Sequence, residues 1–210
     1  MLDDAMTQVL RIEFLDLSRY ISSPNYALIK LHGSINWGRE ISNGPAALMT
    51  APHTYNHQRL IDEVQQLDIS DQYRLVNNCP MWREDSCFVF PAIAIPLENK
   101  DAFVCPSTHE DHLRKLIPNV DKIITVGWRA METKFLSLLT GALPHRGVPT
   151  MIVSGSHDGA KETHVNLARC VRQVAELGYL LPPTLLDSGF SGLILRERDK
   201  LNQFLRLKIK

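Results

Sequence analysis

A histidine and a glycine stand together at the end of an apolar run, in the segment Leu28–Trp37. An imidazole exchanges its proton near neutral pH, so His32 could take a proton from a sugar hydroxyl or from an attacking water. Gly33 carries no side chain and would let a ligand approach the backbone. If Tyr26–Leu31 is a strand, both residues lie at its carboxyl end, where open α/β sheets bind ligands. A hydrogen-bonded turn histidine is the alternative interpretation.

Other histidines have the spacing of neighbours on a helix. His53 and His57 are four residues apart, but Pro52 and the lack of an acidic third ligand favour a solvated loop over a metal site. His109 and His112 fall in the first turns of a predicted helix, and we expect both at the surface.

Two further groups of residues have competing interpretations. Ser, His and Asp occur together within Gly155–Gly159, yet catalytic triads assemble from distant residues, so a helix-capping loop is predicted. Trp128 and Arg129 either stack on and pair with a nucleotide or pack at a sheet edge, and the residues leave both open. The spacing of the cysteines excludes a paired Cys-x-x-Cys zinc ribbon, so no metal is predicted. These cysteines are Cys79, Cys87, Cys105 and Cys170.

Two successive strand–helix units are predicted to position such groups. The apolar run Lys122–Val126 ends at Gly127, and Thr150–Val153 ends at the run Ser154–Ser156. A helical pattern follows each strand. Its apolar positions are Phe135, Leu138 and Leu139 in the first helix, and Leu167, Val171, Val174 and Leu177 in the second, with Gly178 as the predicted stop. Two such units imply a parallel sheet with helical crossovers.

Upstream of these units, Ser107–Glu110 has the spacing of a capping box and predicts a helix that ends before Pro118. The apolar run Phe88–Ile95 contains Pro91 and predicts an edge strand or an extended segment. A closing helix is predicted within Leu193–Leu205.

We expect a lead segment over residues 1–25, one domain over 26–190 and a tail over 191–210. The polar stretch 38–86 is interpreted as an insertion or small lid, with a helical stretch over 59–67.

The segment Lys30–Trp37, KLHGSINW, resembles the histidine motif of prokaryotic sirtuin-like domains, several of which act in antiphage defence. Phe90-Pro91, Ile95-Pro96 and Lys100 are similar to the stretch that follows the insertion in that family. The run Asp121–Trp128 resembles the strand whose final glycine meets the nucleotide. By order of motifs, the likeness spans Tyr26 to Phe190.

The resemblance implies an α/β fold with a Rossmann-like parallel sheet and flanking helices, NAD as cofactor, and cleavage of the nicotinamide–ribose bond with water as acceptor. It assigns His32 as general base at the nicotinamide ribose. The residues it places along NAD are Gly33, Gly127, Trp128 and Ser154.

The chain also departs from that family. The glycine-rich loop that supports the pyrophosphate has no counterpart before His32, and the asparagine–aspartate segment at the ribose is not recognisable in Arg11–Asn25. We therefore expect the second part of such a domain, incomplete on its N-terminal side. A protein deacylase is not expected, because the zinc ligands are missing. The alternatives are a non-catalytic nucleotide-sensing or assembly module, and a plain scaffold in which His32 is structural.

The charge balance limits the partners. Lys and Arg number 23, as do Asp and Glu, so no net positive field would collect nucleic acid or an anionic membrane. We expect a cytoplasmic protein with reduced thiols and no transmembrane segment. An unpaired sheet edge would favour association with another chain or a second copy.

Overall fold

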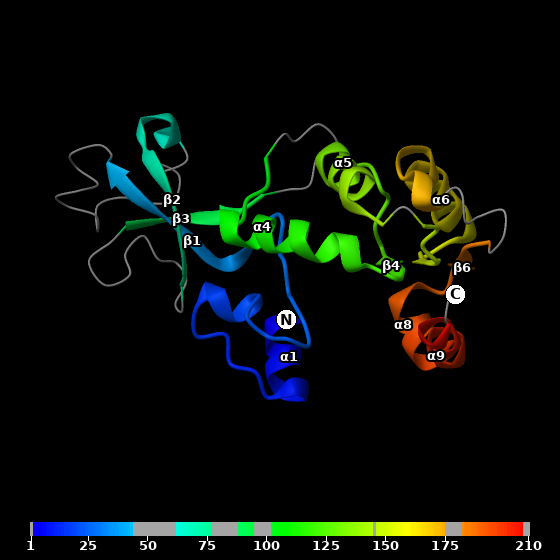
Figure 1. The fold of residues 1–210 in the computed structure, drawn as a ribbon. Coiled ribbons are helices and arrows are strands. Elements are labelled where there is room, and N and C mark those ends of the chain that lie inside the picture. Colours follow the sequence, from blue (N-terminus) through cyan, green and yellow to red (C-terminus); the bar gives the residue numbers. More distant parts are fainter. Residues whose placement is uncertain are drawn as a thin grey trace. The chain divides into compact units, whose positions relative to one another are not determined.

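The computed structural model describes residues 2–43, 62–76, 88–94, 102–144, 146–174 and 182–207. The chain divides into two compact units (Figure 1). The first comprises Met1–Ile95 and Phe103–His112, and the second comprises Pro96–Ala102 and Leu113–Lys210. Each unit is described by itself.

The first unit contains a three-stranded antiparallel sheet. Strand β1 (Gly33–Asn43) lies in the middle and pairs with β2 (Asp68–Leu75) and β3 (Phe88–Ile93). Of the two interpretations of the run Phe88–Ile95, the edge strand is confirmed over Phe88–Ile93, and Pro91 lies in a strand that pairs on one side only. The other elements that begin in this unit are α1 (Leu2–Leu10), η1 (Leu17–Tyr20), η3 (Val64–Gln66) and α4 (Ser107–Leu116).

The strand predicted over Tyr26–Leu31 is wrong, because these residues form no regular ladder. The Leu28 N–H donates to the Tyr20 carbonyl at 2.8 Å, and the Leu31 carbonyl accepts from the Val104 N–H at 2.8 Å. Leu28 and Leu31 pack against a buried aromatic cluster. The apolar side chains of this irregular segment therefore pack against the core without forming a strand, and the strand begins only at Gly33.

Aromatic rings form the core of the first unit. Tyr20 and Trp37 are fully buried, with ring centroids 5.4 Å apart and nearly perpendicular planes. The Tyr20 hydroxyl donates to Asp3 at 2.6 Å, and the Lys30 ammonium lies 2.7 Å from the same carboxylate. Burial opposes ionisation of Asp3, but hydrogen bonds from Lys30, Tyr20 and Asn36 outweigh it and lower the pKa of Asp3. This network holds α1 against the aromatic core.

The second unit contains the predicted parallel sheet, together with a third strand that was not predicted. Its strands are β4 (Ile123–Val126), β5 (Thr150–Val153) and β6 (Thr184–Leu186), in that spatial order. Helices α5 (Thr133–Ala142) and α6 (His157–Cys170) lie on one side of the sheet, and α8 (Gly189–Leu195) and α9 (Arg198–Arg206) lie on the other (Figure 1). A short helix, η4 (Ile117–Asn119), precedes β4.

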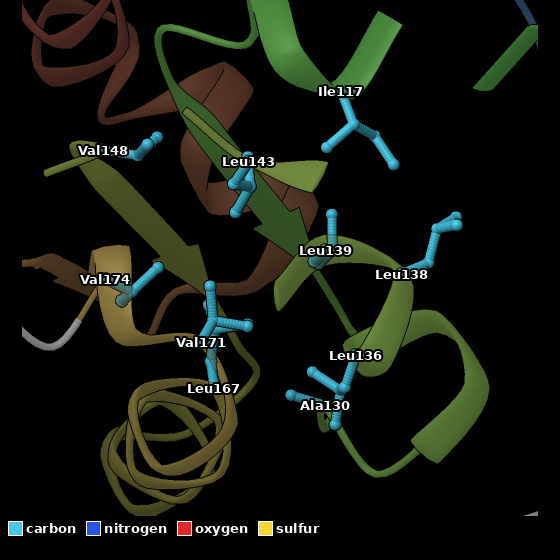
Figure 2. Packing of buried hydrophobic residues seen from close by; sticks show 10 residues of the cluster. All are labelled: Ile117, Ala130, Leu136, Leu138, Leu139, Leu143, Val148, Leu167, Val171 and Val174. Atoms are coloured by element: carbon cyan, nitrogen blue, oxygen red, sulfur yellow. The ribbon is translucent and has the colours of Figure 1, made fainter. Parts of the chain in front are cut away.

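Each side of this sheet has its own apolar core. Figure 2 shows the larger cluster on the side of α5 and α6, formed by Ile117, Ala130, Leu136, Leu138, Leu139, Leu143, Val148, Leu167, Val171 and Val174. On the other side, Met151, Val153 and Leu186 pack against Leu193 and Phe204. Burial on both faces explains why β5 is entirely apolar apart from Thr150.

The helices predicted after Ser107, Gly127 and Ser156 are confirmed with changed limits, and α6 already ends at Cys170. Of the helical stretch predicted over 59–67, the described part contains only the short helix η3. The helix predicted from the capping box is α4, which ends at Leu116, and Pro118 lies in η4 directly after it. In place of the single closing helix predicted within Leu193–Leu205, the structure has α8 and α9, which are separated by Arg196 and Glu197. Among the described residues, no helix has the length and apolar character needed to cross a membrane.

Candidate functional site

His32 and Gly33 form a tight turn in the first unit. The Gly33 N–H donates to the Lys30 carbonyl at 3.1 Å, and the His32 carbonyl accepts from the Ala94 N–H at 2.8 Å. Gly33 has a φ of +75°, and a Cβ there would lie 1.8 Å from the Ala92 carbonyl oxygen. The turn therefore requires glycine in order to pack against β3.

The expected location of His32 at the carboxyl end of a strand is wrong. His32 precedes β1, and β1 belongs to an antiparallel sheet. The side chain of His32 is half-buried beside this sheet. His32 therefore does not lie at the carboxyl edge of an open parallel sheet. Its position next to a strand gives no argument for a chemical role.

Bare backbone is present at three strand ends of the second unit. Gly127 follows β4 with φ +64°, and Gly189 comes soon after β6 with φ +67°. Gly155 follows β5, and a Cβ on Gly127 or Gly155 would meet nothing within 4 Å. Hydrogen bonds tie these loops together: the Gly127 N–H donates to the Val153 carbonyl at 3.0 Å, and the Gly189 N–H donates to the Ser154 carbonyl at 2.8 Å. The three loops line the carboxyl edge of the parallel sheet.

Helix α6 begins at this edge. Ser156 is its N-cap, and the Ser156 hydroxyl accepts from the Gly159 N–H at 3.1 Å, which confirms the predicted capping loop. Ser154 is half-buried beside this first turn, since a Cβ on Gly159 would lie 2.6 Å from the Ser154 Oγ. The first turn of a helix carries partial positive charge and attracts an anionic group, although Asp158 in the same turn already supplies one carboxylate.

Trp128 packs instead of standing free for stacking. The Trp128 Nε1 donates to the Glu132 carboxylate, and its ring meets Phe135 with centroids 5.5 Å apart. The Trp128 carbonyl accepts from the Thr163 hydroxyl at 2.8 Å. The neighbouring Arg129 is exposed. Of the two interpretations that the residues left open, the contacts favour packing for the Trp128 ring.

The structure thus brings together three of the predicted site residues, Gly127, Trp128 and Ser154, in the second unit, while His32 and Gly33 belong to the first. Two glycines were missed. Gly155 could have been found as a glycine directly after a predicted strand. Gly189 could not, because β6 has only three residues and was not predicted.

His109 is fully buried, so its predicted surface location is wrong. Its Nε2 lies 2.9 Å from the Leu17 carbonyl oxygen, and its ring meets Trp37 edge-on with centroids 5.4 Å apart. Burial lowers the pKa of His109, an effect that the hydrogen bond to Leu17 opposes and the nearby His112 reinforces. This histidine is a neutral member of the aromatic core.

In the ranges that the structure describes, no three His, Cys, Asp or Glu side chains gather as metal ligands would. His53, His57, Cys79, Cys87, Lys100 and Gly178 lie outside the described residues. Cys105 is buried and Cys170 half-buried, both as free thiols.

Comparisons with known proteins provide no relative from which a function could be inferred. No protein-family model, curated protein or solved structure matches the chain.

Proposed function

We propose that the second unit binds NAD at the carboxyl edge of its parallel sheet, as the second part of a Rossmann-like, sirtuin-like domain. The observation that carries this proposal is the bare backbone at neighbouring strand ends, formed by Gly127, Gly155 and Gly189. Glycines there let a ligand lie against the main chain, and the first turn of α6 can attract a phosphate.

The proposed reaction is hydrolysis of the nicotinamide–ribose bond. The bond between the ribose carbon and the nicotinamide nitrogen breaks, and the nitrogen keeps the electron pair. A water oxygen bonds to the ribose carbon and gives up its proton. The resemblance assigns that proton to His32 as general base. Gly33 would hold the backbone of His32 in place through its packing on β3.

Calorimetric titration of the full chain with NAD, with nicotinamide release followed in parallel, tests binding and chemistry separately. We expect saturable binding that Gly155→Leu weakens by at least about tenfold, because the added side chain enters the space that the dinucleotide needs. Gly141→Leu is the matched control, since a Cβ on Gly141 also meets nothing within 4 Å but lies in α5.

His32→Ala should keep NAD binding and lower the rate of nicotinamide release by at least about a hundredfold. Absence of saturable binding by the unaltered chain would reject the proposed site. Binding without any release would reject the hydrolase while leaving a nucleotide-binding module.

A second candidate function, assembly, is favoured by the free edge of β4. The N–H groups of Ile123 and Gly127 bond toward β5, so the alternate residues Ile124 and Val126 direct their backbone groups away from it. The side chains of Ile124 and Val126 are 37% and 43% exposed. They lie in register with the buried Met151 and Val153 of β5. Helices α8 and α9 therefore bury the side chains of β5 on this face of the sheet but leave those of β4 partly exposed. Within the described part of the second unit, no strand pairs with this edge of β4.

We infer that a second copy of the chain covers this edge, and light scattering should give a mass above that of the monomer. Val126→Lys should shift the mass to that of the monomer, because a lysine on an edge strand opposes pairing. Val165→Lys is the control: Val165 is 60% exposed but lies on α6. A monomeric unaltered chain over the whole accessible concentration range would count against the assembly.

A further inference from the structure

The second unit has a cationic cavity at the end of its sheet opposite the glycine loops. The cavity encloses about 520 Å³. Three segments supply its walls: the entry to β4, the loop before β5 and the end of α9. The lining residues are Asp121, Lys122, Arg146, Gly147, Leu205, Arg206 and Leu207.

Positive charge dominates this cavity. Lys122, Arg146 and Arg206 face it together with a single carboxylate, Asp121. Asp121 is 70% exposed and lies 3.4 Å from the Lys122 ammonium, so solvent screens much of its charge. Arg146 and Arg206 are both exposed, and neither takes part in an ion pair among the described residues.

Structural roles explain two of these cations, because Lys122 is 16% exposed and paired with Asp121. Arg206 lies in the last turn of α9, where a positive side chain offsets the negative end of the helix dipole. Arg146 lies four residues beyond the end of α5, so it does not belong to the last turn of that helix. Arg146 is therefore the cation in this cavity without such an explanation.

We propose that this cavity binds a small molecule that carries a diphosphate group. Two arginines and one lysine line the same cavity and could together bind several phosphate oxygens. Arginine bonds a phosphate in bidentate fashion, and lysine adds a point charge. The volume lies within the range of small-molecule sites. Leu205 and Leu207 add an apolar wall, which suits an organic body attached to the phosphates. This site shares no residue with the proposed NAD site.

Calorimetry with inorganic pyrophosphate on the full chain tests the proposal. We expect saturable binding that weakens as salt is raised, and a loss of at least about tenfold in affinity in the Arg146→Gln, Arg206→Gln double variant. Arg198→Gln is the matched control, because Arg198 is an exposed arginine at the other end of α9. Circular dichroism melting of each variant checks that the fold is kept.

Gly155→Leu separates this site from the NAD site. Pyrophosphate binding should persist in that variant if the cationic cavity is the site, whatever the outcome of the NAD titration. No saturable binding of pyrophosphate, equal binding by the double variant, or loss of binding in Gly155→Leu alone would overturn the proposal.

Discussion

Gly33→Ala should destabilise the first unit by roughly 3 kcal/mol or more, measured as the free energy of unfolding in urea. Two costs add together. The φ of +75° is strained for any residue with a Cβ, and that Cβ would lie 1.8 Å from the Ala92 carbonyl oxygen. The contact is with backbone, so relief requires β3 to move away from the turn and weakens its ladder with β1.

Gly155→Ala is the control for this effect. A Cβ on Gly155 meets nothing within 4 Å and its φ lies outside the left-handed region, so the free energy of unfolding should change by less than about 0.5 kcal/mol. Equal stability of the two alanine variants would show that the turn at Gly33 does not pack against β3 as described.

The parallel sheet could be predicted from the sequence because its signals are local. The strand Thr150–Val153 matches β5 residue for residue, and the glycine or serine that follows each predicted strand marks the strand end. A sheet buried on both faces produces continuous apolar runs, which are easy to recognise. The strand β6 has three residues and gives no comparable signal.

The first unit was harder to predict because its contacts are long-range. Leu28 and Leu31 look like strand residues, yet they bury their side chains against rings contributed by Tyr20 and Trp37. The requirement for glycine at position 33 comes from Ala92, almost sixty residues away, and no local pattern contains it. The position of His32 relative to a strand was therefore misjudged.

His109 shows the same limit, since helical spacing and a capping box place it in α4 without revealing that this face is buried. Polar character favours the surface, and only the carbonyl of Leu17, far away in the chain, makes burial acceptable by taking a hydrogen bond from the ring. The ring can donate this bond in either protonation state, but a second proton would go to the buried Nδ1, which has no hydrogen-bond partner among the described residues, so its charge must be accommodated inside the aromatic cluster.

Acid should therefore destabilise the first unit in a window that begins near pH 6.5, the ordinary pKa of histidine. The pKa of His109 is lowered in the folded state, so in this window the unfolded chain binds a proton that the folded chain does not. Stability is then complete above pH 6.5 and falls as the pH drops toward the folded pKa, by up to about 1.4 kcal/mol per pH unit. Asp3 acts in the same direction only below its ordinary pKa of 3.8, so its effect begins at a lower pH than that of His109.

Urea unfolding at a series of pH values on His109→Gln isolates the histidine. A glutamine amide can donate to the Leu17 carbonyl but does not titrate, so the variant should lose about 1–2 kcal/mol above pH 6.5 and show a shallower pH dependence below it. His112→Gln is the control on the same helix and should keep most of the slope, because His112 is only half-buried. An unchanged slope in His109→Gln would mean that His109 is not the buried neutral group, and that the acid sensitivity arises elsewhere.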